Sequence, residues 1–317
     1  MTTLLYIDAG QRLEDSYTYR YYGDLYRELT KLAQIYLYEG KVSNIQELLQ
    51  HIPETVDCII FGLGFFAQSH ASHFEKIKGL AELEIPVVCL LHKAQKLLKE
   101  KLEFCRLNKI NLLVDPCITY KEYGEELQIP SMRAWFTADP ALFYPREEPR
   151  IYDIGFSGAS HGAQKIEGET QDLREKVYER LKATEYNLFW NMQNIPDDRL
   201  PLDEYILKMS QSKIWFATTG PLLDVSPRYF EVMMSKTLLL CNAMPTQYEG
   251  VFEDGVNCVT FKNDLSDLEE KIEFYLKNEA DRDIIVENAY HMATTKYTWK
   301  HMAEELLKKI RDIKRGE

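Results

Sequence analysis

Short apolar runs that alternate with longer amphipathic segments constrain the fold of this chain more than any other feature of its sequence. Each run has the length and composition of a buried strand. The runs occupy residues 4–7, 58–61, 87–91, 111–114, 151–156, 188–190, 214–217, 238–241 and 259–261. Strands that alternate with helices form a parallel sheet covered by helices on both faces. The sequence therefore predicts an α/β fold.

The segments between these runs carry apolar residues at helical spacing, often with polar residues suited to a helix start. They predict helices over about residues 22–37, 44–50, 69–82, 94–108, 172–182, 202–210, 227–235, 266–276 and 300–314. The last of these has an apolar stripe that begins at Trp299 and continues through Met302 and Leu306.

A linker divides this alternation into two halves. The chain has 317 residues, which exceeds one core of ordinary size. Prolines and charges cluster between residues 139 and 149, a composition typical of a connection between domains. We therefore expect a first domain over residues 1–145 and a second that begins at residue 150.

Charge and cysteine content indicate the cellular compartment of the protein and the class of ligand that it binds. The formal net charge is −12, which argues against nucleic acid as the main ligand, because phosphate backbones require a basic footprint. The first ten residues have neither a basic region nor a long apolar run, so we expect no signal peptide and no transmembrane segment. None of the six cysteines forms a CxxC pair, which favours reduced thiols in a cytoplasmic protein.

Candidate residues of the first half follow its predicted strands. Ligands of parallel sheets bind at the carboxyl ends of the strands, which places Asp8, Gly10, Gly64 and His92 around one crevice. Asp8 and His92 are candidate catalytic bases, although a structural histidine is an equally good interpretation of His92.

Residues 62–67 match the dinucleotide pattern GxGxxA, but the expected acid at the end of the next strand is missing. A tight turn between strand and helix is therefore the better interpretation of these glycines. His70 and His73 are three residues apart without a third ligand, so we predict no metal site there.

In the second half, small residues follow the strand at 151–156. They are Ser157, Gly158, Ala159 and Ser160, and they suit a phosphate cradle because small residues let backbone N–H groups approach an anion. The segment lacks the Gly-Lys-Ser/Thr ending of a P-loop. Polar residues also end the next two strands of this half, namely Trp190 with Asn191 and Thr218 with Thr219.

A short helix predicted at 227–235 adds an arginine and a glutamate. Ser226 is its predicted N-cap and Pro227 its first residue. Arg228 and Glu231 are three residues apart and share one face. The arginine, beside the positive helix end, suits phosphates, and the glutamate suits the hydroxyls of a ribose. The alternative is a surface Arg–Glu pair on an ordinary helix.

Several motifs of the second half resemble the glycosyltransferases of the GT-B fold, in particular the spore-maturation CgeB-like proteins and related family 1-type transferases. The resemblance covers residues 139–310. It rests on DPALFYP at 139–145, IGFSG at 154–158, RYFE at 228–231, FEDG at 252–255 and the segment 265–299.

This resemblance implies two tandem Rossmann-like domains, over residues 1–145 and 150–299, and a helix at 300–317 that crosses back to the first domain. It also implies a nucleoside diphosphate sugar as donor, with UDP or GDP as the nucleotide. Glu231 matches the ribose-binding glutamate, while Arg228 and Gly158 match residues near the diphosphate, with Tyr229 in the same motif. Many relatives carry a second acid eight positions before the glutamate, where this chain has Leu223.

The resemblance further implies transfer without a metal or a cofactor, to an acceptor hydroxyl such as that of a saccharide held by the first domain. Two other functions are also compatible with the sequence. One is a two-lobed binding protein or sensor without catalysis. The other is a nicotinamide-dependent oxidoreductase, which rests on residues 62–67 alone.

Overall fold

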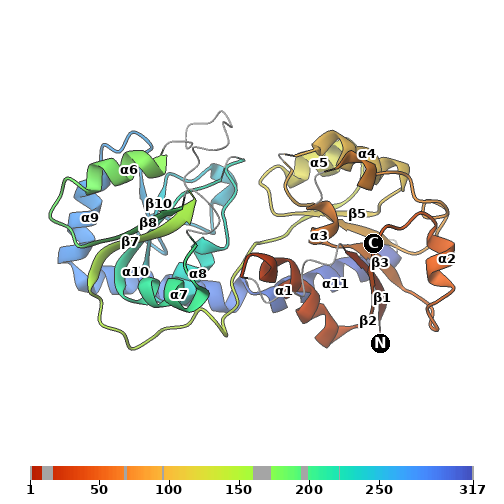
Figure 1. Ribbon diagram of the computed structural model, residues 1–317, viewed down its shortest axis with the longest axis horizontal. Helices are drawn as coiled ribbons and strands as arrows, with labels where there is room; N and C mark the ends of the chain where they lie inside the picture. Colours follow the sequence, from red (N-terminus) through yellow and green to blue (C-terminus); the bar gives the residue numbers. More distant parts are fainter. Residues whose placement is uncertain are drawn as a thin grey trace. The chain divides into compact units, whose positions relative to one another are not determined.

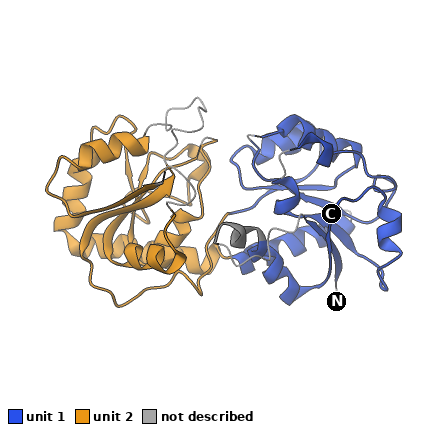
Figure 2. Cartoon of the chain, viewed as in Figure 1, with its two compact units in different colours: residues 1–135, 299–317 blue, residues 136–298 orange. Residues whose placement is uncertain are grey.

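The computed structural model describes residues 2–8, 17–67, 70–94, 96–159, 173–193, 199–220 and 222–315. The chain divides into two compact units (Figures 1 and 2). Unit 1 comprises Met1–Trp135 with Trp299–Glu317, and unit 2 comprises Phe136–Thr298. Each is built around its own parallel sheet, which confirms the predicted α/β class with two tandem Rossmann-like domains.

The sheet of unit 1 has the strand order β2-β1-β3-β4-β5-β6, with every neighbouring pair parallel. Its strands are β1 (Thr3–Asp8), β2 (Gln34–Glu39), β3 (Cys58–Phe61), β4 (Val87–Leu90), β5 (Leu112–Asp115) and β6 (Ser131–Arg133). Its helices are α1 (Tyr17–Leu32), α2 (Ile45–Leu49), α3 (Leu63–Phe66), α4 (Leu98–Leu107), α5 (Tyr120–Leu127) and α11 (Trp299–Arg315), with a 3-10 turn at Ala71–His73.

Helix α11 returns the end of the chain to unit 1, as the fold prediction required. It packs along α1, and its predicted apolar stripe is buried, including Trp299, Met302 and Leu306. Near its end, the ammonium group of Lys314 donates to a carboxylate oxygen of Asp57 at 2.5 Å. The unit is therefore assembled from two segments that are far apart in sequence.

The sheet of unit 2 has the order β11-β10-β9-β7-β8 and is also parallel throughout. Its strands are β7 (Tyr152–Ala159), β8 (Leu188–Gln193), β9 (Ser212–Ala217), β10 (Leu238–Asn242) and β11 (Val259–Phe261). Its helices are α6 (Leu173–Leu181), α7 (Leu202–Ser210), α8 (Arg228–Met234), α9 (Leu268–Lys277) and α10 (Glu279–Lys296), with a 3-10 turn at Thr246–Tyr248.

Alternate residues of these strands face opposite layers of helices. Phe156 and Phe216 belong to the core beneath α6 and α9, whereas Trp215 faces α7 and contacts Tyr205. A Cβ added to Gly155 would lie 2.5 Å from Cζ3 of Trp215. Glycine at this position therefore lets a tryptophan of β9 lie across β7.

Two helix predictions in unit 1 are wrong. The helix predicted to residue 37 ends at Leu32, and β2 follows it over Gln34–Glu39. The segment QIYLYE is rich in residues that favour strands, and sheet pairing with β1 overrides the helical spacing. The helix predicted over 69–82 is replaced by the turn at Ala71–His73 and by non-helical chain, in which Gly79 has φ +80°.

The division between the units falls earlier than the predicted domain end at residue 145. Phe143 is buried against Tyr205 of α7, with ring centroids 6.3 Å apart. Arg150 donates hydrogen bonds of 2.7 Å to the carbonyl oxygens of Ser212 and Lys236. The predicted linker is thus packed onto the second domain. No helix in the described part of the chain is long and apolar enough to cross a membrane.

Candidate functional site

The strand order of unit 2 reverses between β7 and β9, since β8 follows β7 on one side and β9 lies on the other. Connections that leave such neighbouring strands diverge and open a crevice at the carboxyl end of the sheet. Gly158 and Ala159 end β7, while Thr218 and Thr219 directly follow β9. Four of the residues predicted to bind a donor therefore lie at this reversal point.

Two arginines converge on the end of β7. The guanidinium carbons of Arg174 and Arg228 lie 5.6 and 5.7 Å from the centre of the Phe156 ring. Arg174 donates to the hydroxyl of Thr218 at 2.9 Å and to the carbonyl of Ala159 at 2.6 Å. A Cβ added to Gly158 would lie 2.9 Å from Nη2 of Arg228. The glycine thus leaves room for this guanidinium.

Arg174 is a buried cation beside a second cation. It is 6% exposed, and burial lowers its pKa to about 9, with the charge of Arg228 acting in the same direction. Among the described residues no carboxylate forms an ion pair with it. A desolvated positive charge next to another is stabilised by an anion. The reversal point of unit 2 is therefore suited to a phosphate group.

Arg228 and Glu231 lie on the same short helix, and Tyr205 links them. The Tyr205 hydroxyl donates to Oε2 of Glu231 at 2.6 Å, and the Arg228 guanidinium contacts the same hydroxyl. Glu231 is only 1% exposed. The pair is therefore not the exposed surface Arg–Glu pair considered as the alternative.

Helix α8 differs from the prediction at its start. Its N-cap is Pro227, without a side-chain cap, and not the predicted Ser226. The Ser226 hydroxyl is buried without a hydrogen-bond partner in the described residues. The helix has only 7 residues, so the arginines, and not the helix end, supply the attraction for an anion.

Two predicted donor residues pack against other aromatic rings of unit 2, Trp190 partly buried and Tyr229 completely buried. The Trp190 ring packs between Phe156 at 4.6 Å and Tyr178 at 5.5 Å. Tyr229 is 0% exposed and packs against Phe252 at 5.2 Å. Tyr229 is therefore a core residue and not a donor contact, and the ring of Trp190 packs against the core beneath α6.

Of the other predicted donor residues, Ser157 and Asn191 are described and Ser160 is not. Ser157 is buried on β7, opposite the partly exposed Asn191 of β8 in the sheet register. Ser160 lies outside the described residues. Leu223, at the position of the missing acid, has φ +57° in an exposed turn. The neighbouring acid, Asp224, lies against Gly220, where an added Cβ would be 3.0 Å from its carboxylate oxygen.

Arg174 and Tyr205 were missed by sequence reasoning. An arginine near the start of a helix, after a glycine-rich segment that follows a strand, was a usable signal for Arg174. Tyr205 gave none, because it is one of 20 tyrosines and its partner is 26 residues away.

In unit 1 the strand order reverses between β1 and β3, and an acid lies at that point. Asp8 ends β1 and is 0% exposed. A Cβ added to Gly62 would lie 2.5 Å from its Oδ2, and one added to Gly64 would collide with its Oδ1. The glycines of the GxGxxA pattern therefore accommodate a carboxylate of the protein itself, as expected for a tight turn.

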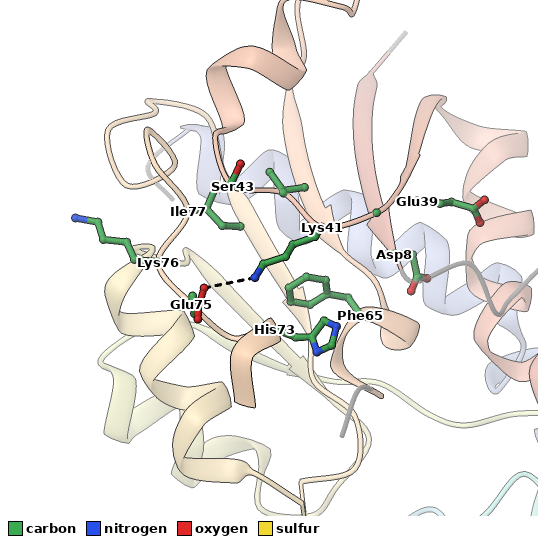
Figure 3. A pocket seen from close by; sticks show the side chains of 11 residues that line it. Asp8, Glu39, Lys41, Ser43, Phe65, His73, Glu75, Lys76 and Ile77 are labelled. Carbon is green, nitrogen blue, oxygen red and sulfur yellow. Dashed lines mark ion pairs between the residues drawn. The ribbon is translucent and has the colours of Figure 1, made fainter. Parts of the chain in front are cut away.

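A cavity of about 440 Å³ adjoins Asp8 in unit 1 (Figure 3). Phe65 and Ile77 form buried parts of its wall, and Glu39 contributes a second carboxylate. At the rim, the ammonium group of Lys41 pairs with a carboxylate oxygen of Glu75 at 3.6 Å. The mixture of acids, bases and one aromatic ring suits a polar organic ligand.

Of the remaining candidates in unit 1, Gly10 lies outside the described residues and Gly64 does not line the cavity. His92 does not line it either. Burial lowers the pKa of His92 to about 3, helped by the charges of Lys93 and Lys101. The described residues hold no group of three or more His, Cys, Asp or Glu side chains that could bind a metal.

Comparisons with known proteins agree on the class of this fold. Residues 154–308 match the family model described as glycosyl transferase-like. No curated protein matches the chain in sequence.

Similar solved structures extend over nearly the whole chain. An α-glucosyltransferase in complex with UDP has a TM-score of 0.63 at 14% identity, covering 98% of this chain and 100% of its own. Sucrose-phosphate synthase of Thermosynechococcus elongatus has 0.62 at 8%, with 100% of both chains covered. HepE of Anabaena in complex with UDP-glucose has 0.59 at 13%, covering 98% of this chain and 100% of its own. Residues 154–308 are thus glycosyl transferase-like in sequence, and the whole chain shares the two-domain GT-B fold of these glycosyltransferase structures.

Proposed function

We propose that this glycosyltransferase takes its sugar from a nucleoside diphosphate donor bound at the carboxyl ends of β7 and β9. The observation that carries the proposal is the pair of guanidinium groups at the end of β7, Arg228 beside Gly158 and Arg174 on the carbonyl of Ala159. UDP is the first nucleotide to test, because the structures of HepE and the α-glucosyltransferase contain it. GDP is the alternative.

Arg228 and Glu231 have different roles in this proposal. Negative charge grows on the diphosphate as the bond to the sugar breaks, and a guanidinium that is already in place stabilises that charge. Arg228 fits this role, with Arg174 adding a second charge behind it. Glu231 accepts hydrogen bonds from the ribose hydroxyls, which are the same before and during the reaction.

Two fixed cations allow the diphosphate to leave without a divalent metal. We therefore expect full activity in EDTA, measured as release of free nucleotide from the donor. Loss of activity in EDTA and its return with manganese would contradict this part of the proposal.

The acceptor binds in the cavity of unit 1 beside Asp8. A saccharide suits it, since carboxylates accept hydrogen bonds from hydroxyl groups and the ring of Phe65 offers an apolar surface. If the enzyme inverts, Asp8 is a better candidate than His92 for the base. Asp8 lines the cavity, whereas a histidine with a pKa of about 3 accepts a proton only weakly.

The remaining parts of the proposal follow from composition. The net charge of −12 favours a small acceptor over nucleic acid. All six cysteines are free thiols, which is consistent with the cytoplasm.

An oxidoreductase is a poor alternative on physical grounds. The pyrophosphate of a dinucleotide would have to approach Gly62 and Gly64, where the buried carboxylate of Asp8 already lies. The pyrophosphate and the Asp8 carboxylate are both negatively charged and would repel each other.

Calorimetric titration with UDP and GDP tests the donor site. We expect one nucleotide to bind, and Arg228→Ala and Arg174→Ala each to weaken it at least tenfold, since hydrogen bonds to charged groups contribute about 1.5–3 kcal/mol. Arg180→Ala is the matched control, because Arg180 lies on the same helix as Arg174 but pairs with Glu269 at the surface. Unchanged binding by folded Arg228→Ala and Arg174→Ala variants would place the donor elsewhere.

A transfer assay separates the enzyme from a sensor that only binds. Incubation with a UDP-sugar and a panel of mono- and disaccharides should release UDP faster than the donor alone. A protein that binds UDP-sugars but never releases UDP would be a binding protein.

A further inference from the structure

Tyr205 occupies a fixed position in unit 2 between the two residues assigned to the donor. It lies on α7 and is 6% exposed. Its ring meets those of Phe143 and Trp215 edge to face, with centroids 6.3 and 5.8 Å away. Two aromatic neighbours leave the ring little freedom to rotate, so the position of its hydroxyl is determined by the core of the domain.

That hydroxyl contacts both functional side chains of α8. It donates to Glu231 Oε2 at 2.6 Å and also contacts the guanidinium group of Arg228. A hydroxyl can donate one hydrogen bond and accept two, so a neutral Tyr205 can serve the acid and the cation at the same time. Burial and the charge of Glu231 raise its pKa well above the ordinary value, which keeps it neutral.

The contact matters because Glu231 is almost completely removed from water. A carboxylate that is 1% exposed depends on donors from the protein to keep its orientation. A short hydrogen bond to a charged acceptor is among the strong ones. Fixing Oε2 restricts rotation of the carboxylate about its last bond, which defines where its other lone pairs point.

We propose that Tyr205 is a positioning residue for donor recognition. It holds the Glu231 carboxylate in the orientation that receives the ribose and joins it to Arg228, which receives the diphosphate. This inference rests on the proposed function and adds a residue to it. Its consequence is that the contributions of Tyr205 and Glu231 to nucleoside binding are not additive, because each acts through the same hydrogen bond.

The test is a double-mutant cycle on the affinity for nucleosides and nucleotides. Wild type, Tyr205→Phe, Glu231→Gln and the double variant are titrated with uridine, guanosine, UDP and GDP. We expect Tyr205→Phe to weaken the preferred nucleoside about tenfold in the wild-type background and less than twofold in the Glu231→Gln background. In turnover, KM for the donor should rise while kcat changes little.

Tyr152→Phe is the matched control, since it removes a tyrosine hydroxyl that accepts a hydrogen bond of 3.1 Å from Lys208, which lies on α7 as Tyr205 does. Its nucleoside affinity should equal that of wild type. If Tyr205→Phe does not fold, Glu231→Gln probes the same contact from its other side, and it should weaken the nucleoside while leaving the Tyr205 ring in place.

The outcomes separate the inference from the function beneath it. A wild-type protein that binds neither UDP nor GDP refutes the proposed function, and the inference with it. Normal nucleotide binding, together with unchanged or strictly additive effects of Tyr205→Phe, refutes the inference alone.

Discussion

The two units share a topology but place opposite charges at the point where their strand order reverses. In unit 1 the carboxylate of Asp8 lies against Gly62 and Gly64, and in unit 2 the guanidinium of Arg228 lies against Gly158. In both, glycine provides space at the end of a strand. The topology therefore supplies a crevice, and the side chain that fills the space above the glycine decides which ligand the crevice can attract.

The neighbours of the glycines also differ in how easily they move. Asp8 has a short side chain that is 0% exposed, so its carboxylate cannot move aside without disturbing the turn. Arg228 contacts Gly158 through the far end of a long side chain. Replacement of the glycine by alanine should therefore lower the stability of the fold in unit 1 and the affinity for the nucleotide in unit 2.

The largest effect that we expect comes from Asp8→Asn. Proton abstraction by a base in the correct position contributes about 10²–10⁴ in rate, so turnover should fall by that factor if Asp8 activates the acceptor. Affinity for the nucleotide, measured by calorimetry, should not change, because the nucleotide binds in unit 2. Turnover within twofold of wild type would leave Asp8 a structural residue of the turn.

Gly64→Ala comes next and tests the rigid side of the comparison. The added methyl group would collide with the buried Asp8 carboxylate, and overpacking of this kind costs about 1–3 kcal/mol. The measurement is the midpoint of urea unfolding. A variant as stable as the parent would show that Asp8 can relax, and the contrast between the units would then be weaker than we propose.

Gly158→Ala tests the flexible side. The new Cβ would lie 2.9 Å from Nη2 of Arg228, and the end of that side chain can move away. The new Cβ would also lie 3.0 Å from Cζ of the buried Phe156, so we expect stability to fall slightly, by no more than about 1 kcal/mol. Affinity for UDP should fall about tenfold as the guanidinium is displaced. Lost stability with unchanged affinity would reverse the assignment of the two glycines.

The last prediction concerns Lys101, which is buried in unit 1 and donates to the carbonyls of His92 and Lys93 at 2.7 and 3.0 Å. Burial lowers its pKa to about 8 from an ordinary value of 10.5. Between these pH values the unfolded chain binds more protons than the folded one, so stability rises with pH. We therefore compare the free energy of unfolding in urea of the parent and of Lys101→Met. From pH 8 to pH 10 the value for the parent should rise relative to that of the variant, and below pH 7 the difference between the two should stay constant. No relative gain over that range would mean that Lys101 titrates normally.

The parts of the fold that follow from local pattern were predictable. The strand Cys58–Phe61 and the helix Leu202–Ser210 have the predicted bounds, because their apolar spacing and their flanking residues agree. Strand β2 was assigned to a helix, since its pairing with β1 is a long-range effect that no local spacing reveals.

In the candidate site, too, the features within one helix were predictable and the contacts between elements were not. The common face of Arg228 and Glu231 follows from helical geometry. The burial of Glu231 and its bond to Tyr205 depend on how α7 packs beside α8, and the second arginine depends on how α6 meets the end of β7. Such contacts between elements are not encoded in any one segment.

The return of α11 to unit 1 has a consequence for synthesis on the ribosome. Unit 2 is an insertion in unit 1, and its entry and exit are joined by a bridge between Ala138 and Thr298. Everything that unit 2 needs has been made once residue 298 leaves the ribosome, and it can fold at that point. The sheet of unit 1 is made before unit 2, yet the helix that covers α1 is made after it, so this domain waits for α11 with apolar surface exposed. We therefore expect the unit synthesised first to complete its folding second.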